Sequence, residues 1–200
     1  MKISLCSTGL KDWDGSVLII GLFAEELNKQ IESIDLPCKR SLTDRLKEQE
    51  FTAKDGELIS FDFPENKPSK LILVGLGKAK NLVINDFRNA AALSARASIG
   101  RIGKLGIFFP WSIFDHESAA QAVGEAIRLA LFKDLRFKSK PEPFLKTNHV
   151  ELIGVNQSAE SCLSKLSPLC AGVELARELV GAPPNNITPT TLAEAAILIS

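Results

Sequence analysis

One run of apolar residues limits what this chain can fold into. Leu71, Ile72, Leu73 and Val74 follow one another without a polar residue, and the run ends at Gly75. It predicts a strand buried on both faces, because a half-exposed strand alternates apolar and polar side chains. Such a strand needs helices on both sides of its sheet, so we expect an α/β fold.

Strands and helices alternate on either side of this run. We predict further strands over Lys2–Cys6, Ser16–Ile20, Glu57–Asp62, Leu105–Phe109 and His149–Val155. Apolar residues spaced by three and four predict helices over 86–103 and 118–132. Ser41 is placed to cap a shorter helix that runs to about Glu50, and Ile102 is expected on the buried face of the helix over 86–103. Together these elements predict a three-layer α/β/α sandwich with a mixed sheet.

The last part of the chain differs from what precedes it. A helix is predicted from about Ser158 to Gly181, and Pro168 should break or kink it, or begin a new helix capped by Ser167. Prolines and asparagines over 183–186 are typical of a domain boundary, and Thr188 with Pro189 can begin another helix. That helix reaches Ser200 without a C-terminal cap, so we expect a truncated chain. We divide it into a domain over 1–157, a linker helix over 158–182 and the start of a second domain over 183–200.

Composition argues against several classes of protein. The chain has 24 Lys plus Arg and 24 Asp plus Glu, so no net charge attracts it to nucleic acid or to an anionic membrane. The apolar run over 17–23 is too short to span a membrane, and no secretory signal is evident. Cys6, Cys38, Cys162 and Cys170 form no CxxC pair, which favours idle thiols in a reducing compartment. We therefore expect a cytoplasmic protein.

The motifs that could carry chemistry are all incomplete. The stretch Val74-Gly75-Leu76-Gly77-Lys78 lacks the spacing of a phosphate loop and the third glycine of a dinucleotide fingerprint, so it predicts a tight turn. His116 and His149 lie in different segments, and neither has a second ligand one helical turn away. Asp12, Asp14 and Gly15 lack the remaining ligands of a calcium loop.

Two further candidates complete this survey. No serine stands in a Gly-x-Ser-x-Gly elbow. Four basic residues, which we expect in a solvated loop, cluster after the helix over 118–132: Lys133, Arg136, Lys138 and Lys140. The sequence thus predicts no catalytic, cofactor-binding or metal-binding residue in this chain.

From Glu174 onward the sequence contains Glu174-Leu175-Ala176-Arg177-Glu178-Leu179-Val180, Pro183 or Pro184, Asn185, Thr188-Pro189 and Leu192-Ala193. This order of residues resembles the leucyl aminopeptidase family of cytosolic metallopeptidases (family M17). Upstream, Val74 to Lys78, Arg88 with Ala90 to Ala92, and Phe51, Gly56 and Glu57 are similar to family stretches in the same order. Two positions depart from the pattern: Ala53 replaces a glycine and Glu178 an aspartate.

The resemblance implies two domains, of which only the second is catalytic. In that family a macro-domain-like N-terminal domain precedes a C-terminal domain that holds two divalent metal ions (Mn or Zn) and hydrolyses N-terminal residues, preferably leucine, from peptides. The metal-binding and signature motifs would lie beyond Ser200, so the resemblance implies no catalytic residue here. It also implies a hexamer when the protein is complete.

Two other functions stay open on the sequence alone. A stand-alone macro-like module could bind a nucleotide ligand beyond its strand ends, where Gly75 to Lys78 is the only suggestive loop. A nucleic-acid-binding protein would need the basic residues over 133–140 to act with others, and the net charge of zero argues against it.

Overall fold

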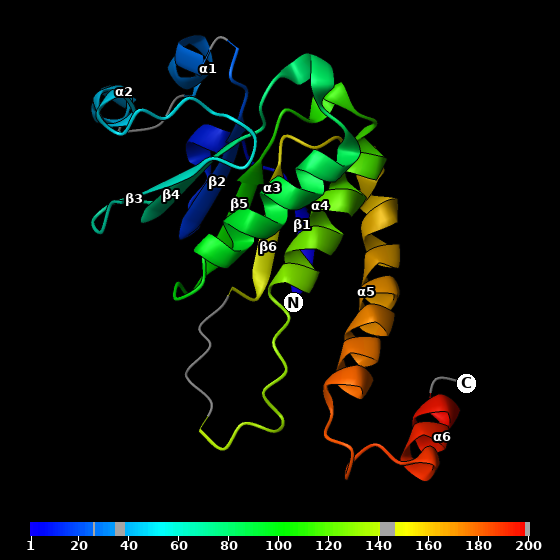
Figure 1. Ribbon diagram of the computed structural model, residues 1–200. Helices are drawn as coiled ribbons and strands as arrows, with labels where there is room; N and C mark the ends of the chain where they lie inside the picture. Colours follow the sequence, from blue (N-terminus) through cyan, green and yellow to red (C-terminus); the bar gives the residue numbers. More distant parts are fainter. Residues whose placement is uncertain (26, 35–38, 141–146, 199–200) are drawn as a thin grey trace.

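The computed structural model describes residues 1–25, 27–34, 39–140 and 147–198, and for 39–41 it describes the backbone alone. A six-stranded sheet lies at the centre of the fold (Figure 1). The strand order is β1-β6-β5-β2-β4-β3, and neighbouring strands are parallel except β3 and β4, which are antiparallel. The strands are β1 (Lys2–Cys6), β2 (Val17–Leu22), β3 (Leu58–Asp62), β4 (Lys70–Gly75), β5 (Lys104–Phe108) and β6 (His149–Ile153). The predicted strands are confirmed to within one or two residues at each end.

Strand β2 lies inside the sheet, and every one of its six residues is buried. Leu18 pairs with Leu71 of β4 on one side and with Gly106 of β5 on the other. In β4, the strand expected to be covered on both faces, all residues but Lys70 are buried. The continuous apolar run therefore predicted the burial of this strand correctly.

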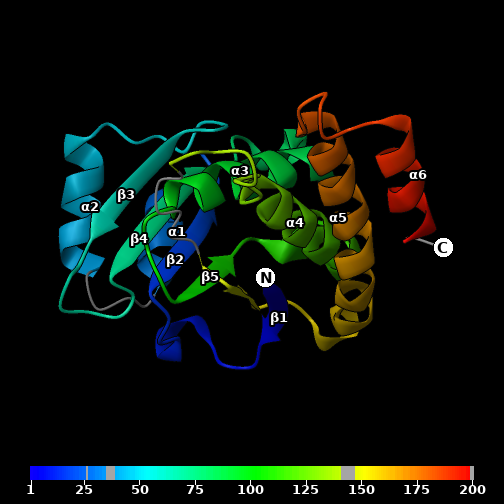
Figure 2. The same cartoon turned by 90° about the horizontal axis from the view of Figure 1, so that it is seen from below.

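Helices cover both faces of the sheet and give it two separate cores. On one face, Leu18, Ile20 and Leu22 pack in a cluster with residues of α1 (Leu27–Ser33) and α2 (Lys39–Glu48). On the other, Val17 and Ile19 belong to a cluster with residues of α3 (Ile84–Ala97), α4 (His116–Ala130) and α5 (Glu160–Gly181). The three-layer sandwich with a mixed sheet is thus confirmed (Figures 1 and 2).

The predicted ends of α3 and α4 need correction. Helix α3 ends at Ala97 instead of continuing to residue 103, and Ile102 is 69% exposed rather than buried. Gly100 and Gly103, with φ angles of 92° and 120°, turn the chain from the helix into β5 in conformations that other residues rarely adopt. Helix α4 begins at His116 rather than Ser118, because the Asp115 carboxylate caps it by accepting from the Ser118 amide at 3.0 Å.

The C-terminal part of the chain is almost entirely helical. Helix α5 runs through Pro168 without a break, so neither the predicted break nor a new helix capped by Ser167 is found. It ends at Gly181 as expected, and α6 (Pro189–Ile197) follows with Thr188 as its N-cap. Helix α6 lies beyond α5, at the end of the row of helices (Figure 2), and none of its residues is buried.

Helix α2 ends in a turn that places a non-glycine residue in a left-handed conformation. Glu50 has a φ angle of 52°, its amide donates to the Lys47 carbonyl, and the Phe51 amide donates to the Leu46 carbonyl. This is the hydrogen-bond pattern of a Schellman motif, in which glycine is the preferred residue at the position of Glu50. Ser41, expected as the N-cap, lies inside α2, which begins at Lys39.

The end of β4 touches the loop that precedes β3. A Cβ atom on Gly75 would lie 2.0 Å from the Lys54 carbonyl oxygen, so only glycine fits where the two backbones meet. The Gly75 amide donates to the Glu57 carbonyl, and the Gly56 amide donates to the Gly75 carbonyl. The glycine after the apolar run is therefore required by a close backbone contact.

Replacing Glu50 by glycine should stabilise the fold. The side chain is exposed, and glycine removes the cost of the left-handed conformation, so we expect Glu50→Gly to raise the free energy of unfolding by about 0.5–1 kcal/mol. Urea titration followed by circular dichroism measures it. The control is Glu50→Ala, which keeps a Cβ atom and should gain little; equal gains from both variants would contradict this explanation.

Replacing Gly75 by alanine should destabilise the fold strongly. The new methyl group would overlap backbone atoms that cannot rotate away, so we expect Gly75→Ala to cost about 3 kcal/mol or more. Gly56→Ala is the matched control, because Gly56 has a φ angle of 72° but nothing within 4 Å of an added Cβ, and should cost about 1 kcal/mol. Similar unfolding midpoints for the two variants would refute the close contact.

Candidate functional site

The loop after β4 uses its amide groups within the fold. The amides of Gly75, Leu76 and Gly77 donate to the carbonyls of Glu57, Leu22 and Ala53 respectively. The amide of Ala79 donates to the Glu25 carboxylate at 3.2 Å. A phosphate loop needs several free amides that point at one anion. Here the bonded amides join β2, β4 and the 51–57 loop, so this stretch acts as a structural junction.

The 51–57 loop is held by one carboxylate. Glu57 Oε2 accepts from the Thr52 amide at 3.1 Å, from the Thr52 hydroxyl at 3.0 Å and from the Lys54 amide at 3.0 Å. Gly56 has the positive φ angle that the turn requires, and Phe51 is buried under α1 and α2. Phe51, Gly56 and Glu57, noted in the sequence for their family resemblance, therefore shape this loop.

Aromatic side chains pack beside the ends of β2 and β5. Strand ends whose connections leave to opposite faces, as here, commonly border a ligand crevice. Phe109 packs edge-on against Phe87, with ring centroids 5.1 Å apart, and stacks with Trp111 at 5.7 Å. A Cβ atom on Gly21 would lie 2.8 Å from Phe109 and 2.9 Å from Leu76. Phe87, Phe109 and Trp111 thus belong to the core on the α3–α5 face.

A polar cluster on the sheet face opposite α3–α5 was not foreseen from the sequence. The Ser4 hydroxyl lies 3.0 Å from His149 Nε2, and a Glu151 carboxylate oxygen lies 3.7 Å from the same nitrogen. The carboxylate also accepts from the Trp13 indole at 2.7 Å and pairs with Lys104 at 3.4 Å, which helps to raise the pKa of Lys104. Side chains alternate along β6, so His149 and Glu151 lie on the same face. This spacing in a predicted strand is the sequence signal that could have indicated the cluster.

This cluster lacks the arrangement of a catalytic triad. In a triad, the serine and the carboxylate bind different ring nitrogens, so that the carboxylate orients the base toward the nucleophile. Here both groups face Nε2 of His149, and Ser4 sits within β1, paired along its length with β6. The cluster satisfies a partly buried carboxylate and ties β1, β5 and β6 together.

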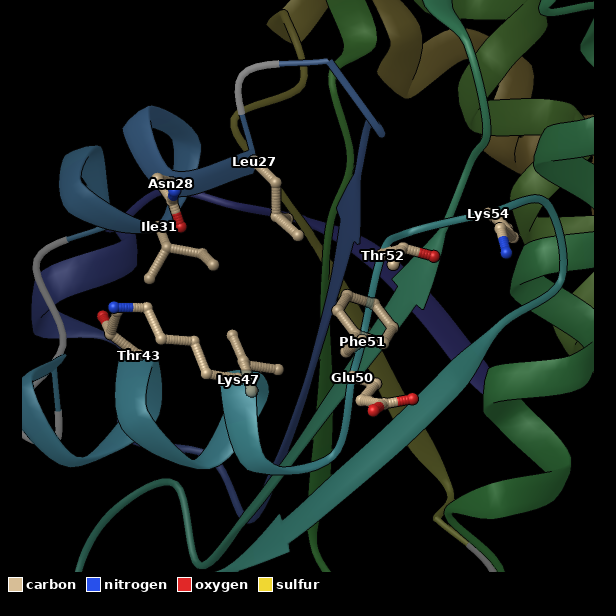
Figure 3. Close-up of a pocket in the computed structure, with 10 residues that line it drawn as sticks. Leu27, Asn28, Ile31, Thr43, Lys47, Glu50, Phe51, Thr52 and Lys54 are labelled. Atoms are coloured by element: carbon tan, nitrogen blue, oxygen red, sulfur yellow. The ribbon is translucent and has the colours of Figure 1, made fainter.

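A pocket of about 420 Å³ lies between α1, α2 and the 51–57 loop (Figure 3). Its apolar side is formed by residues of the core beneath the two helices, among them Ile31, Leu46 and Phe51. Lys47, Glu50 and Lys54 are exposed residues at its edge. The arrangement provides no converging set of acids, bases or nucleophiles, and we assign no chemistry to it.

The remaining candidate site residues form hydrogen bonds or ion pairs within the fold or are buried. His116 Nδ1 accepts from the Asn156 amide at 2.9 Å, and Asp14 pairs with Lys104 at 3.5 Å. Cys162 and Cys170 are buried, and burial raises the pKa of both thiols; Cys38 lies outside the described residues. Within residues 1–25, 27–34, 39–140 and 147–198, no group of three His, Cys, Asp or Glu side chains could hold a metal ion.

One residue of the predicted basic loop has a specific contact. Arg136 pairs with Asp134 at 2.7 Å and donates to the Glu178 carbonyl of α5, also at 2.7 Å. The guanidinium lowers the pKa of Asp134 to about 2. The expected exposure is confirmed for Lys133, Arg136, Lys138 and Lys140, and Arg136 makes these contacts in addition.

No helix in the described part of the chain is both long and apolar enough to cross a membrane.

Curated relatives match the chain along its whole length. It is 46% identical over 200 residues to a probable cytosol aminopeptidase of Prochlorococcus marinus (strain MIT 9313), covering 100% of this chain and 41% of that protein. A probable cytosol aminopeptidase of Synechococcus sp. (strain CC9311) is 42% identical over 197 residues, covering 98% of this chain and 40% of that protein. The chain therefore spans about two fifths of the length of these relatives.

Solved structures show the same fold. A mutant of tomato leucine aminopeptidase superposes with a TM-score of 0.80 at 24% identity, covering 100% of this chain and 42% of that chain. The bottromycin maturation enzyme BotP in complex with Mn gives a TM-score of 0.64 at 20% identity, covering 90% of this chain and 35% of that chain.

The family profile described as "Cytosol aminopeptidase family, N-terminal domain" matches residues 19–141, well over half of the chain. The chain therefore belongs to the cytosol aminopeptidase family, of which it carries the N-terminal domain.

Proposed function

We propose that this chain is the non-catalytic N-terminal part of a longer aminopeptidase that releases N-terminal residues, preferably leucine, from peptides. The observation that carries the proposal is the match of the whole chain to two fifths of proteins named as probable cytosol aminopeptidases. The remaining three fifths of such a protein would bind the peptide and perform the hydrolysis.

The residues that the structure describes do not fit a two-metal centre. A pair of divalent ions, manganese or zinc, supplies an activated water for peptide hydrolysis when it is bound. Such a centre needs several carboxylate or other donor side chains directed at one point, and the described residues offer no group of three. We propose that the metal ions and the peptide are bound by the part of the longer protein that follows this chain.

Exposed apolar side chains support the presence of a further domain. Val180 near the end of α5 is 88% exposed, and Leu192, Ile197 and Leu198 in and after α6 are exposed as well. Water-exposed apolar groups gathered in this way are typical of surfaces that another part of a protein covers. We propose that the chain following residue 200 covers them, with 1–157 as the N-terminal domain, 158–182 as the linker helix and 183–200 as the start of the catalytic domain.

Assembly and location follow from the same family relationship. We propose a homo-hexamer of the longer protein in the cytoplasm, with a macro-like N-terminal domain that contributes to assembly and not to hydrolysis. Native mass spectrometry of the longer protein tests the hexamer directly.

The proposal predicts that activity requires the part of the protein beyond Ser200. We expect the protein read from the gene past this residue to hydrolyse leucine p-nitroanilide with added Mn²⁺ or Zn²⁺, and a chelator to abolish the activity. The purified 200-residue chain should give no turnover under the same conditions, because its described residues offer no metal-binding donor set.

A chromogenic assay with both proteins at equal concentration makes the comparison. The control for a contaminating peptidase is Gly75→Ala in the short chain, which should leave its background unchanged. Metal-dependent release of leucine by the short chain would overturn the proposal, as would an inactive longer protein that binds metal.

A further inference from the structure

Helix α5 is held to the rest of the molecule in two different ways. Its first half has buried side chains, Cys162, Leu166 and Cys170. From Ala171 to Gly181 no residue is fully buried, and Val173, Leu175 and Leu179 are half-buried, so the hydrophobic core holds this distal half less firmly. A helix with little buried surface frays easily, because most helical stability in proteins comes from tertiary contacts.

Three arginines link the distal half of α5 to α4 and to the loop after α4. Arg128 of α4 donates to both carboxylate oxygens of Glu174, at 2.8 and 2.6 Å. Arg177 of α5 donates to the Leu129 carbonyl at 2.7 Å, and its guanidinium lies 5.9 Å from the centre of the Phe132 ring. Arg136 donates to the Glu178 carbonyl at 2.7 Å. We call these three residues and their partners the arginine clamp.

Arg128 is the central member of the clamp. Its side chain is only 15% exposed, and its Nη1 also donates to the carbonyl and hydroxyl oxygens of Ser167, beside Pro168. The hydrogen bonds to Glu174 raise the pKa of Arg128. One guanidinium thus fastens two successive parts of α5, which the single ammonium group of a lysine cannot reproduce.

The clamp leaves an apolar stripe on the opposite side of α5. Side chains two residues apart on an α-helix point about 200° apart. Ala176 and Val180 stand two residues after Glu174 and Glu178, and both are exposed. Leu169, about two and three turns before them on the same side, is 48% exposed. The stripe therefore faces away from α4 because the clamp holds the other side.

We infer that Arg128, Arg136 and Arg177 are positioning residues, which keep the distal half of α5 helical and fix the direction in which its apolar stripe faces. This inference rests on the proposed function in one respect only, which is that the apolar stripe meets the part of the protein beyond Ser200. The clamp itself consists of contacts within this chain.

Hydrogen–deuterium exchange of the 200-residue chain tests the clamp. In Arg128→Ala, amides over 171–181 should exchange at least about tenfold faster, because a charge-assisted, partly buried contact is lost, while amides of β2, β4 and β5 stay protected. Arg128→Lys should not restore slow exchange, because lysine lacks the forked donor. Glu174→Ala should give the same local effect, and adding it to Arg128→Ala should change little more.

Arg88→Ala is the matched control. It removes an arginine that pairs with Glu125 of α4 at 3.7 Å and has no contact with α5 among those described. Its exchange over 171–181 should equal that of the unaltered chain. Unchanged exchange over 171–181 in Arg128→Ala would overturn the inference, as would full rescue by lysine or an equal rise across the whole sheet.

None of these measurements depends on peptidase activity. An inactive longer protein would therefore count against the proposed function and leave the clamp standing, whereas unaltered exchange would count against the clamp alone.

Discussion

Burial of β2 and β4 on both faces is the constraint on which the rest of the structure depends. Their side chains alternate between two cores, so each face needs its own cover, supplied by α1 and α2 on one side and by α3, α4 and α5 on the other. Close packing also limits the size of the side chains near the ends of these strands. An added Cβ atom on Gly75 would overlap the backbone of the 51–57 loop, and one on Gly21 would overlap Phe109.

Sequence patterns predicted the helices and strands that depend on side-chain periodicity and capping. The buried run over 71–74, the apolar periodicity of α3 and the Thr188–Pro189 helix start all follow from side-chain patterns or capping, and the structure agrees. Helix α5 continues through Pro168 while both Cys162 before it and Cys170 after it pack in the core, and local propensity alone could not reveal this outcome. Helix α3 ends early because two glycines turn the chain, and this local signal was present in the sequence.

The candidate sites show the same division. Sequence spacing argued against a phosphate loop at Gly75 to Lys78, and in the structure the amides of Gly75, Leu76 and Gly77 are bonded within the fold. It could not predict the cluster of Ser4, His149 and Glu151 or the contact of Arg128 with Glu174, because these involve partners far apart in the sequence. The resemblance in the segment from Glu174 onward identified the family, while the structure shows that Glu174, Arg177 and Glu178 of that segment hold α5 to α4 and to the loop after it.

We propose that this chain is one part of a longer enzyme and that the rest of this enzyme covers its exposed C-terminal apolar side chains. Hydrogen–deuterium exchange compared between the 200-residue chain and the longer protein measures this cover. Protection over 176–198 should rise markedly in the longer protein, while protection of the sheet strands stays unchanged. Equal exchange over 176–198 in both proteins would contradict it, because the surface would then face water in either case.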